Sequence, residues 1–321
     1  MNTIDQFSFS EKKAIIRVDF NVPINNGEVT DNSRIVAASP TIKKIISDGG
    51  ACILMSHLGR PKGIDLGLSM ANISKEVERV LGSEILLSKD VVGPDAKSKS
   101  KNLKQGEILL LENLRFHKEE TEGDVAFAKQ LSKLADCYIN DAFGTAHRPH
   151  ASTTTIAQFF EHKFFGKLLE KEVLSIDKVM KSGKKPVLAI LGGAKISTKI
   201  PIVENIIDVV DHIIIGGGMS FTFVKALGGS IGNSIHEDEM INTALDILQL
   251  AKNKSVKIHL PVDALCSTEF SNDGVQKIFD IDKIPDKFEG MDAGPKSLEI
   301  FKEVILKLSL IHISEPTRHH V

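Results

Sequence analysis

The chain has few cysteines and no large excess of charge of either sign. Its three cysteines, Cys52, Cys137 and Cys266, are too few and too dispersed for a disulfide framework or a zinc cluster. Each lies in or beside an apolar run, so we expect buried, reduced thiols. The net charge is −2, so the protein as a whole is not a polyanion binder and any basic site must be local.

Segments for targeting or membrane insertion are also lacking. Residues 1–13 contain no apolar signal core, and no apolar run approaches the length needed to span a bilayer. No basic run of the kind that binds nucleic acid is present. We therefore expect a cytoplasmic protein with neither a membrane nor a nucleic acid as partner.

The 321 residues suggest two domains, and a hydrophobic content of 42% is typical of soluble globular proteins.

Apolar runs alternate with amphipathic stretches in two successive series. In the first, we predict strands at residues 13–19, 51–56, 84–88, 107–112 and 136–140, and helices at 34–47, 71–81 and 124–134. In the second, we predict strands at 186–191, 212–215 and 256–260, and helices at 201–210, 219–227 and 238–251. This alternation predicts an α/β protein with two doubly wound, Rossmann-like parallel sheets. A helical pattern at 165–182 is expected to join them.

From about Leu308 the character of the sequence changes. Residues 298–308 have a helical pattern, but the residues that follow continue neither a helix nor a strand convincingly. We therefore interpret 308–321 as a foreign, unmatched tail. The predicted organisation is a domain at 1–165, an interdomain helix at 166–185, a domain at 186–307, and this tail.

A His and an Arg follow the predicted strand 51–56, in the sequence Ser-His-Leu-Gly-Arg-Pro at 56–61. In open α/β sheets, ligands bind at the carboxyl ends of the strands. The planar fork of Arg60 suits a phosphate or a carboxylate, because it binds two oxygens at once. Taken alone, such a turn is more often a solvated loop.

Three further connections in the first half carry similar groups. Arg34 stands in the first turn of a predicted helix, where the helix dipole disfavours a cation, and this indicates a bound anion. Arg115 and Arg148 each follow a predicted strand, and Arg148 lies between His147 and His150. A metal site at these histidines is not favoured, because no carboxylate or cysteine stands at ligand spacing and Arg148 would repel a cation.

Asp19 and Asn21 share one face of the chain at the end of the first predicted strand. They are suited to accept hydrogen bonds from substrate hydroxyls or to orient a neighbouring arginine, although a turn cap explains them equally well. Each charge-assisted hydrogen bond to a phosphate contributes about 1.5–3 kcal/mol. Four arginines exceed the needs of a neutral metabolite and favour a small molecule with phosphate and carboxylate groups.

Two glycine-rich connections follow strands in the second half. Gly193 precedes Lys195 and Lys199, which lie four residues apart and would repel each other unless an anion sat between them. Gly217 and Gly218 follow the next strand and suggest a flat ligand surface against the backbone. Neither connection matches the Walker A motif or the dinucleotide fingerprint, and either is compatible with a structural turn. Together they suggest a nucleotide.

With these motifs the chain resembles the phosphoglycerate kinase family. The resemblance is carried, in the family's order and spacing, by residues 17–23, 56–61, 111–117, 143–150, 191–199 and 216–219, and it runs to about Lys307. It implies reversible transfer of the acyl phosphate of 1,3-bisphosphoglycerate to ADP, giving 3-phosphoglycerate and ATP in glycolysis. It also implies Mg2+ with the nucleotide, no metal site made by the protein alone, a monomer, and a hinge between the domains.

The resemblance also implies roles for individual residues. Arg34, Lys195 and Lys199 would be catalytic. The residues expected to bind 3-phosphoglycerate are Asp19, Asn21, Arg34, His57, Arg60, Arg115 and Arg148. Those expected on the nucleotide side are Gly193, Lys195, Lys199, Gly217, Gly218 and Gly290.

The sequence departs from the family at its C-terminal end. The family's Asn-Gly-Pro segment and its later Gly-Gly-Gly-Asp-Thr segment do not occur. We therefore expect a truncated second domain. Two alternatives to an active kinase follow: a truncated form that binds 3-phosphoglycerate only, and an unrelated sugar-phosphate-binding regulator without affinity for ADP.

Overall fold

The computed structural model describes residues 2–182, 185–271, 273–307 and 310–313. The chain divides into two units, Met1–Leu174 and Ser175–Val321, and the division falls within helix α6 (Lys167–Ser182). Among the described residues, no helix has both the length and the apolar character needed to cross a membrane.

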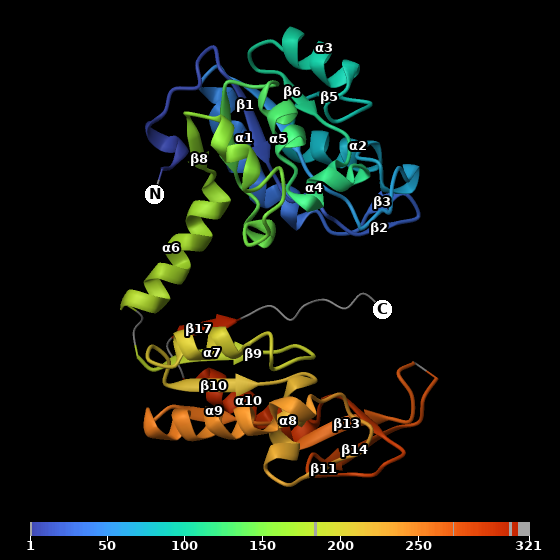
Figure 1. Cartoon of the computed structure of the whole chain (residues 1–321), viewed down its shortest axis with the longest axis vertical. Helices are drawn as coiled ribbons and strands as arrows, with labels where there is room; N and C mark the ends of the chain where they lie inside the picture. The colour runs from blue at the N-terminus through green and yellow to red at the C-terminus, as the bar shows by residue number, and fades with distance from the viewer. Residues whose placement is uncertain (1, 183–184, 272, 308–309, 314–321) are drawn as a thin grey trace. The chain divides into compact units, whose positions relative to one another are not determined.

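The first unit is built on a six-stranded parallel sheet (Figure 1) with the order β5-β6-β4-β1-β7-β8. The strands are β1 (Lys13–Arg17), β4 (Ala51–Met55), β5 (Ile85–Leu87), β6 (Ile108–Leu110), β7 (Cys137–Asn140) and β8 (Lys163–Phe165). The sequence predicted all of these except β8, which has only three residues and runs directly into a helical pattern. A short hairpin of β2 (Ile24–Asn25) and β3 (Glu28–Val29) lies outside the sheet.

Helices cover both faces of this sheet because its strands are apolar on both sides. In β1, Ala14 and Ile16 face one core and Ile15 faces the other. Helices α1 (Ser33–Ser47) and α2 (Ala71–Leu81) pack on the first core, and α3 (Pro94–Asn102) and α5 (Val125–Ser132) on the second. The parallel order brings the carboxyl ends of the strands to one edge.

Short helical segments occupy the connections of the first unit. One is the helix α4 (Lys118–Glu122). The others are the 3-10 turns η1 (Ile4–Gln6), η2 (Leu66–Leu68), η3 (Leu114–Phe116), η4 (Phe143–Thr145) and η5 (Thr155–Phe159).

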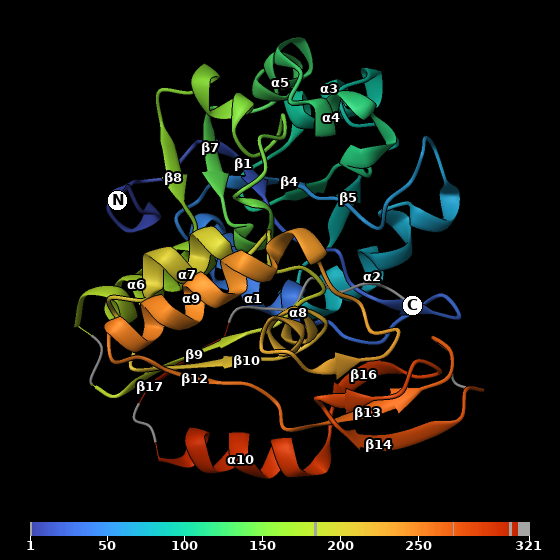
Figure 2. The same ribbon diagram turned by 60° about the horizontal axis from the view of Figure 1, so that its bottom comes forward.

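The second unit has its own parallel sheet, with the order β12-β10-β9-β17. Its strands are β9 (Val187–Leu191), β10 (His212–Ile215), β12 (Lys257–His259) and β17 (Leu310–Ile313). Helices α7 (Ile200–Ile206), α8 (Met219–Ala226) and α9 (Ile241–Asn253) pack on one face. Figure 2 shows α10 (Pro295–Leu306) on the opposite face, where Phe301 contacts Leu188 and Ile214.

Smaller sheets in the second unit were not predicted from the sequence. An antiparallel sheet has the order β14-β13-β16, and β11 pairs with β15. The strands are β11 (Ser230–Ile231), β13 (Asp263–Ser267), β14 (Gln276–Asp280), β15 (Lys283–Ile284) and β16 (Glu289–Ala293). The predicted helix 238–251 begins as the 3-10 turn η6 (Asp238–Met240), and the predicted helix 201–210 already ends at Ile206.

The interpretation of the last residues was wrong where the structure describes them. Residues 310–313 form β17, whose backbone pairs in parallel with β9, with Leu310 opposite Val187. This edge of β9 presents backbone N–H and C=O groups that a neighbouring strand satisfies. Residues 308–309 and 314–321 of the expected tail lie outside the described residues.

Candidate active site

The carboxyl edge of the first sheet gathers the polar groups predicted there. Asp19 follows β1, His57 follows β4, Arg115 lies in η3 after β6, and Arg148 follows β7. Arg34 joins them from the first turn of α1. The positive charges of Arg34, Arg115 and Arg148 all act on His57, so the connections converge on one place as predicted.

Asp19 and Asn21 hold other site residues in position. Asp19 forms an ion pair with Arg34 through Oδ2 and Nη1. The side-chain oxygen of Asn21 accepts a hydrogen bond from Gly59 N at 2.8 Å, which ties the connection after β4 to the connection after β1. Asp19 therefore orients an arginine, as one of the two predicted roles requires, whereas Asn21 holds the backbone of the neighbouring connection instead.

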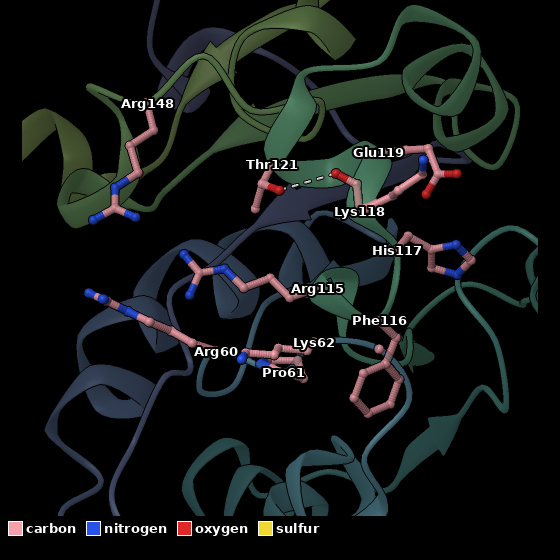
Figure 3. A pocket seen from close by; sticks show the side chains of 11 residues that line it. Arg60, Pro61, Lys62, Arg115, Phe116, His117, Lys118, Glu119, Thr121 and Arg148 are labelled. Carbon is pink, nitrogen blue, oxygen red and sulfur yellow. Dashed lines mark hydrogen bonds between the residues drawn. The ribbon is translucent and has the colours of Figure 1, made fainter.

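A basic cavity of about 790 Å³ opens at this edge (Figure 3), and Arg60, Arg115 and Arg148 line it. The Arg115 guanidinium donates to Gly59 O at 2.7 Å. Burial, followed by the charges of Arg148, Arg17 and Arg60, lowers the pKa of Arg115 to about 10. Such like-charge crowding is relieved by a bound anion, so the cavity suits a ligand with negative groups.

His57 is buried and neutral. Burial, with the charges of Arg17, Arg115, Arg34 and Arg148, holds its pKa well below the usual value. Arg17 Nη2 lies 3.1 Å from His57 Nδ1, and because a guanidinium only donates, Nδ1 is the acceptor. The ring hydrogen of the neutral imidazole is therefore on Nε2, and His57 is a neutral hydrogen-bond donor.

Sequence reasoning assigned no role to Asn113, although it lies within a quoted motif. Its side chain is fully buried and connects the site loops. The amide nitrogen donates to Leu58 O and Leu68 O, each at 2.8 Å, and the amide oxygen accepts from Leu58 N at 3.3 Å and Arg115 N at 3.0 Å. Only its position beside Arg115 was a signal in the sequence.

The two glycine-rich connections of the second unit pack against each other. Gly193 (φ +135°) and Gly217 (φ +67°) have backbone conformations that favour glycine, and a β-carbon on Gly217 would lie 3.0 Å from Gly193 N. Met219 N donates to Gly193 O at 2.9 Å, and a β-carbon on Gly218 would lie 3.2 Å from the Cα of Ala194. The predicted residues Gly193, Gly217 and Gly218 are thus brought together.

Glu237 anchors the turn that carries the two predicted lysines. Its carboxylate accepts from Ser197 Oγ at 2.6 Å and from Ser197 N at 3.1 Å, between Lys195 and Lys199 in the sequence. Burial acts to raise the pKa of Glu237, but these hydrogen bonds outweigh it and lower the pKa. Within the described part of the chain neither lysine forms an ion pair. Nothing in the sequence pointed to Glu237.

Gly290, predicted on the nucleotide side, has a packing reason to be glycine. It lies in β16, where a β-carbon would come 2.0 Å from the Phe221 ring. Its N–H donates to Ser234 Oγ at 2.8 Å. A role toward the nucleotide stays a prediction.

Comparisons with known proteins point to one family. A model of the family "Phosphoglycerate kinase" matches residues 4–317. A phosphoglycerate kinase of Porphyromonas gingivalis is 46% identical over 342 aligned positions, covering 98% of this chain and 82% of that protein. One of Aquifex aeolicus is 43% identical, covering 94% and 77%.

Solved structures of the same family share the fold. The phosphoglycerate kinase of Coxiella burnetii superposes with a TM-score of 0.76 at 34% identity, covering 97% of this chain and 79% of that one. The enzyme of Pyrococcus horikoshii gives a TM-score of 0.79 at 27% identity, covering 98% and 80%.

The chain has two α/β units, each built on a parallel sheet. The first unit carries a basic cavity and the second a glycine-lysine connection, and with the family match these features define a phosphotransferase of the kinase class. Within that class, the chain belongs to the phosphoglycerate kinase family. The expectation that the family match ends near Lys307 was wrong, because the match continues to residue 317. The expected loss of the C-terminal part, on which the binding-only alternative depended, is therefore not supported.

Proposed function

We propose that this chain transfers the acyl phosphate of 1,3-bisphosphoglycerate to ADP, giving 3-phosphoglycerate and ATP, and catalyses the reverse reaction. The observation that carries the proposal is the convergence of four arginines and a neutral histidine at one sheet edge. The relatives named above are phosphoglycerate kinases, which supports the same assignment.

The first unit is the proposed glycerate site. Arg60, Arg115 and Arg148 would bind the phosphate and carboxylate oxygens through charge-assisted hydrogen bonds. His57 would donate from Nε2 without adding charge to a crowded cluster. Arg34, held by Asp19, would reach the transferring phosphoryl group. A ligand with two negative ends accounts for this number of donors better than a neutral one.

The second unit is the proposed nucleotide site. Lys195 and Lys199 lie on either side of Ser197, whose position Glu237 determines. We propose that Lys195 stabilises the phosphoryl group in transfer and that Lys199 binds a nucleotide phosphate. Gly193, Gly217 and Gly218 would allow the adenosine part to approach the backbone.

The chemistry needs positioning and positive charge rather than a base. In the ATP-forming direction, an oxygen of the ADP β-phosphate forms a bond to phosphorus while the bond from phosphorus to the acyl oxygen breaks. The leaving carboxylate needs no proton, and His57, neutral with Nδ1 engaged by Arg17, is not placed to act as a base. Cations around the equatorial oxygens stabilise the transition state.

Magnesium would enter with the nucleotide rather than through a preformed protein site. In the part of the chain that the structure describes, no three His, Cys, Asp or Glu side chains group closely enough to hold a metal ion. Mg2+ in phosphoryl transfer is commonly held by substrate phosphates and one or two carboxylates. No step of the proposed mechanism is therefore assigned to a metal held by the protein alone.

A coupled assay that measures ATP formation from 1,3-bisphosphoglycerate and ADP tests the reaction, and a folded chain without turnover would contradict it.

Titration calorimetry of Lys199→Ala tests the division of sites. We expect about 10- to 100-fold weaker ADP binding, as for the loss of one charge-assisted hydrogen bond, with 3-phosphoglycerate binding unchanged. The exposed Lys252 on α9 provides a control, since Lys252→Ala should change neither affinity. Weakened 3-phosphoglycerate binding in Lys199→Ala would overturn the assignment.

A further inference from the structure

Arg17, at the end of β1, is fully buried. Its Nε donates to Ser152 Oγ at 2.8 Å, its Nη1 donates to Val18 O, and its Nη2 donates to His57 Nδ1 at 3.1 Å. A guanidinium keeps its charge and has no acceptor, so a buried one needs a compensating negative group.

That negative group is Glu120 of α4, which is also fully buried. Its Oε1 accepts from Ser152 Oγ at 2.6 Å and its Oε2 accepts from Ser152 N at 3.0 Å. The Ser152 hydroxyl thus bridges the two buried charges. It has one hydrogen, which points to Glu120, and this leaves a lone pair to receive the Arg17 hydrogen.

The direction of each hydrogen bond follows from the one before it. Glu120 sets the orientation of the Ser152 hydroxyl, the hydroxyl holds Arg17 Nε, and Arg17 then presents Nη2 to the histidine. We propose that Glu120 is a positioning residue for the glycerate site, which acts through Ser152 and Arg17 to hold His57 as the imidazole that carries its hydrogen on Nε2. The network reaches the site from α4 and from Ser152 in the segment after β7, and sequence reasoning gave no role to either Glu120 or Ser152.

Two features of the surroundings support the assignment. Tyr138 donates its hydroxyl to Ser152 O at 2.9 Å, so the segment that carries the bridging hydroxyl is itself fixed. His150 Nδ1 lies 3.7 Å from Glu120 Oε1 and forms no hydrogen bond with it, so Ser152 is the residue whose hydroxyl is hydrogen-bonded to that oxygen. The role of His57 toward 3-phosphoglycerate rests on the proposed function, whereas the hydrogen-bond chain does not.

The first test is nitrogen-15 NMR of the histidine rings in the full chain at pH 7, with His57 identified from the signal lost in His57→Asn. We expect Nε2 to carry the hydrogen and Nδ1 to be unprotonated. A hydrogen on Nδ1, or a doubly protonated ring, would overturn the proposal. This readout requires no turnover, so it stays informative even if the coupled assay shows that the proposed reaction is wrong.

The second test uses two variants that interrupt the chain at different points. Glu120→Gln keeps the shape but places an NH2 group opposite Ser152, and Ser152→Ala removes the bridge. In both we expect a mixture of His57 tautomers. We also expect the KM for 3-phosphoglycerate to rise about tenfold, which is near the smallest loss of affinity expected when one charge-assisted hydrogen bond is removed. The KM for ATP and kcat should stay within about twofold of the parent values.

The control is Ser100→Ala, a buried serine of α3 whose hydroxyl donates to Lys97 O in its own helix. It should leave the tautomer and both KM values unchanged. Folded Glu120→Gln and Ser152→Ala proteins with the parent tautomer, or with a 3-phosphoglycerate KM equal to that of the control, would overturn the proposal. If neither variant folds, the tautomer of the parent chain decides.

Discussion

Removal of the Asn113 side chain is expected to destabilise the first unit strongly. The side chain makes four hydrogen bonds, to Leu58 N, Leu58 O, Leu68 O and Arg115 N. An ordinary hydrogen bond contributes about 0.5–1.5 kcal/mol, so four contribute about 2–6 kcal/mol. Because Leu58 is itself buried, Asn113→Ala leaves backbone groups unpaired and away from water. We therefore expect a loss of about 4 kcal/mol in the free energy of unfolding.

The composition of the chain supplies a selective assay. The protein has no tryptophan and one tyrosine, Tyr138, which is buried in β7 of the first unit. Tyrosine fluorescence during urea or thermal unfolding therefore reports on the first unit alone. For a unit of this size each kcal/mol shifts the melting temperature by about 2–4 °C, so we expect a decrease of about 8–16 °C.

Asn72→Ala is the matched control. Asn72 is exposed, and its amide donates to Leu66 O and Gly67 O at the surface. Surface substitutions usually change stability by less than about 0.5 kcal/mol, so a small effect is expected. If Asn113→Ala and Asn72→Ala lowered the unfolding free energy equally, the reasoning from buried hydrogen bonds would be refuted.

Three further predictions concern the proposed sites and the second unit. Arg34→Ala should lower kcat about 10²–10³-fold and change the KM for 3-phosphoglycerate far less; equal losses in steady-state kinetics would reject a transition-state role. Glu237→Gln should weaken ADP binding about three- to tenfold by loosening the Ser197 turn, and calorimetry showing parent affinity would contradict this. Burial lowers the pKa of His212 and His259, whose rings lie hydrogen-bonded between β10 and β12. The stability they contribute is therefore fully present above the unfolded-state value of about 6.5 and lost as the pH falls below it. Hydrogen exchange in these strands should show this loss and should show it reduced in His212→Gln; an equal pH slope in both proteins would argue against it.

The outline of the proposed glycerate site could be predicted from the sequence. Apolar runs with strand length predicted β1, β4, β6 and β7, and an arginine or histidine follows three of them within a few residues. Parallel strands place their carboxyl ends at one edge, so the clustering of Arg60, Arg115 and Arg148 followed from local pattern and the rule for open sheets. In the second unit the same reasoning placed the glycine-rich connections together. The strand β8 was missed because its three residues carry too little periodicity, and β14 was missed because it is mostly exposed and contains no apolar run.

The sequence by itself thus determined the alternation of elements, the class of fold and the basic character of the site. Only the tertiary structure decided which polar groups meet across the chain. Glu120 and Ser152 are 32 residues apart, Ser197 and Glu237 are 40 apart, and Arg17 and Ser152 are 135 apart. No local pattern encodes such pairs, because each depends on where separate elements bury their polar atoms. The neutral state of His57 is likewise a tertiary property. It arises from burial and from the guanidinium of Arg17, which lies on a different strand, β1, and donates a hydrogen bond to Nδ1.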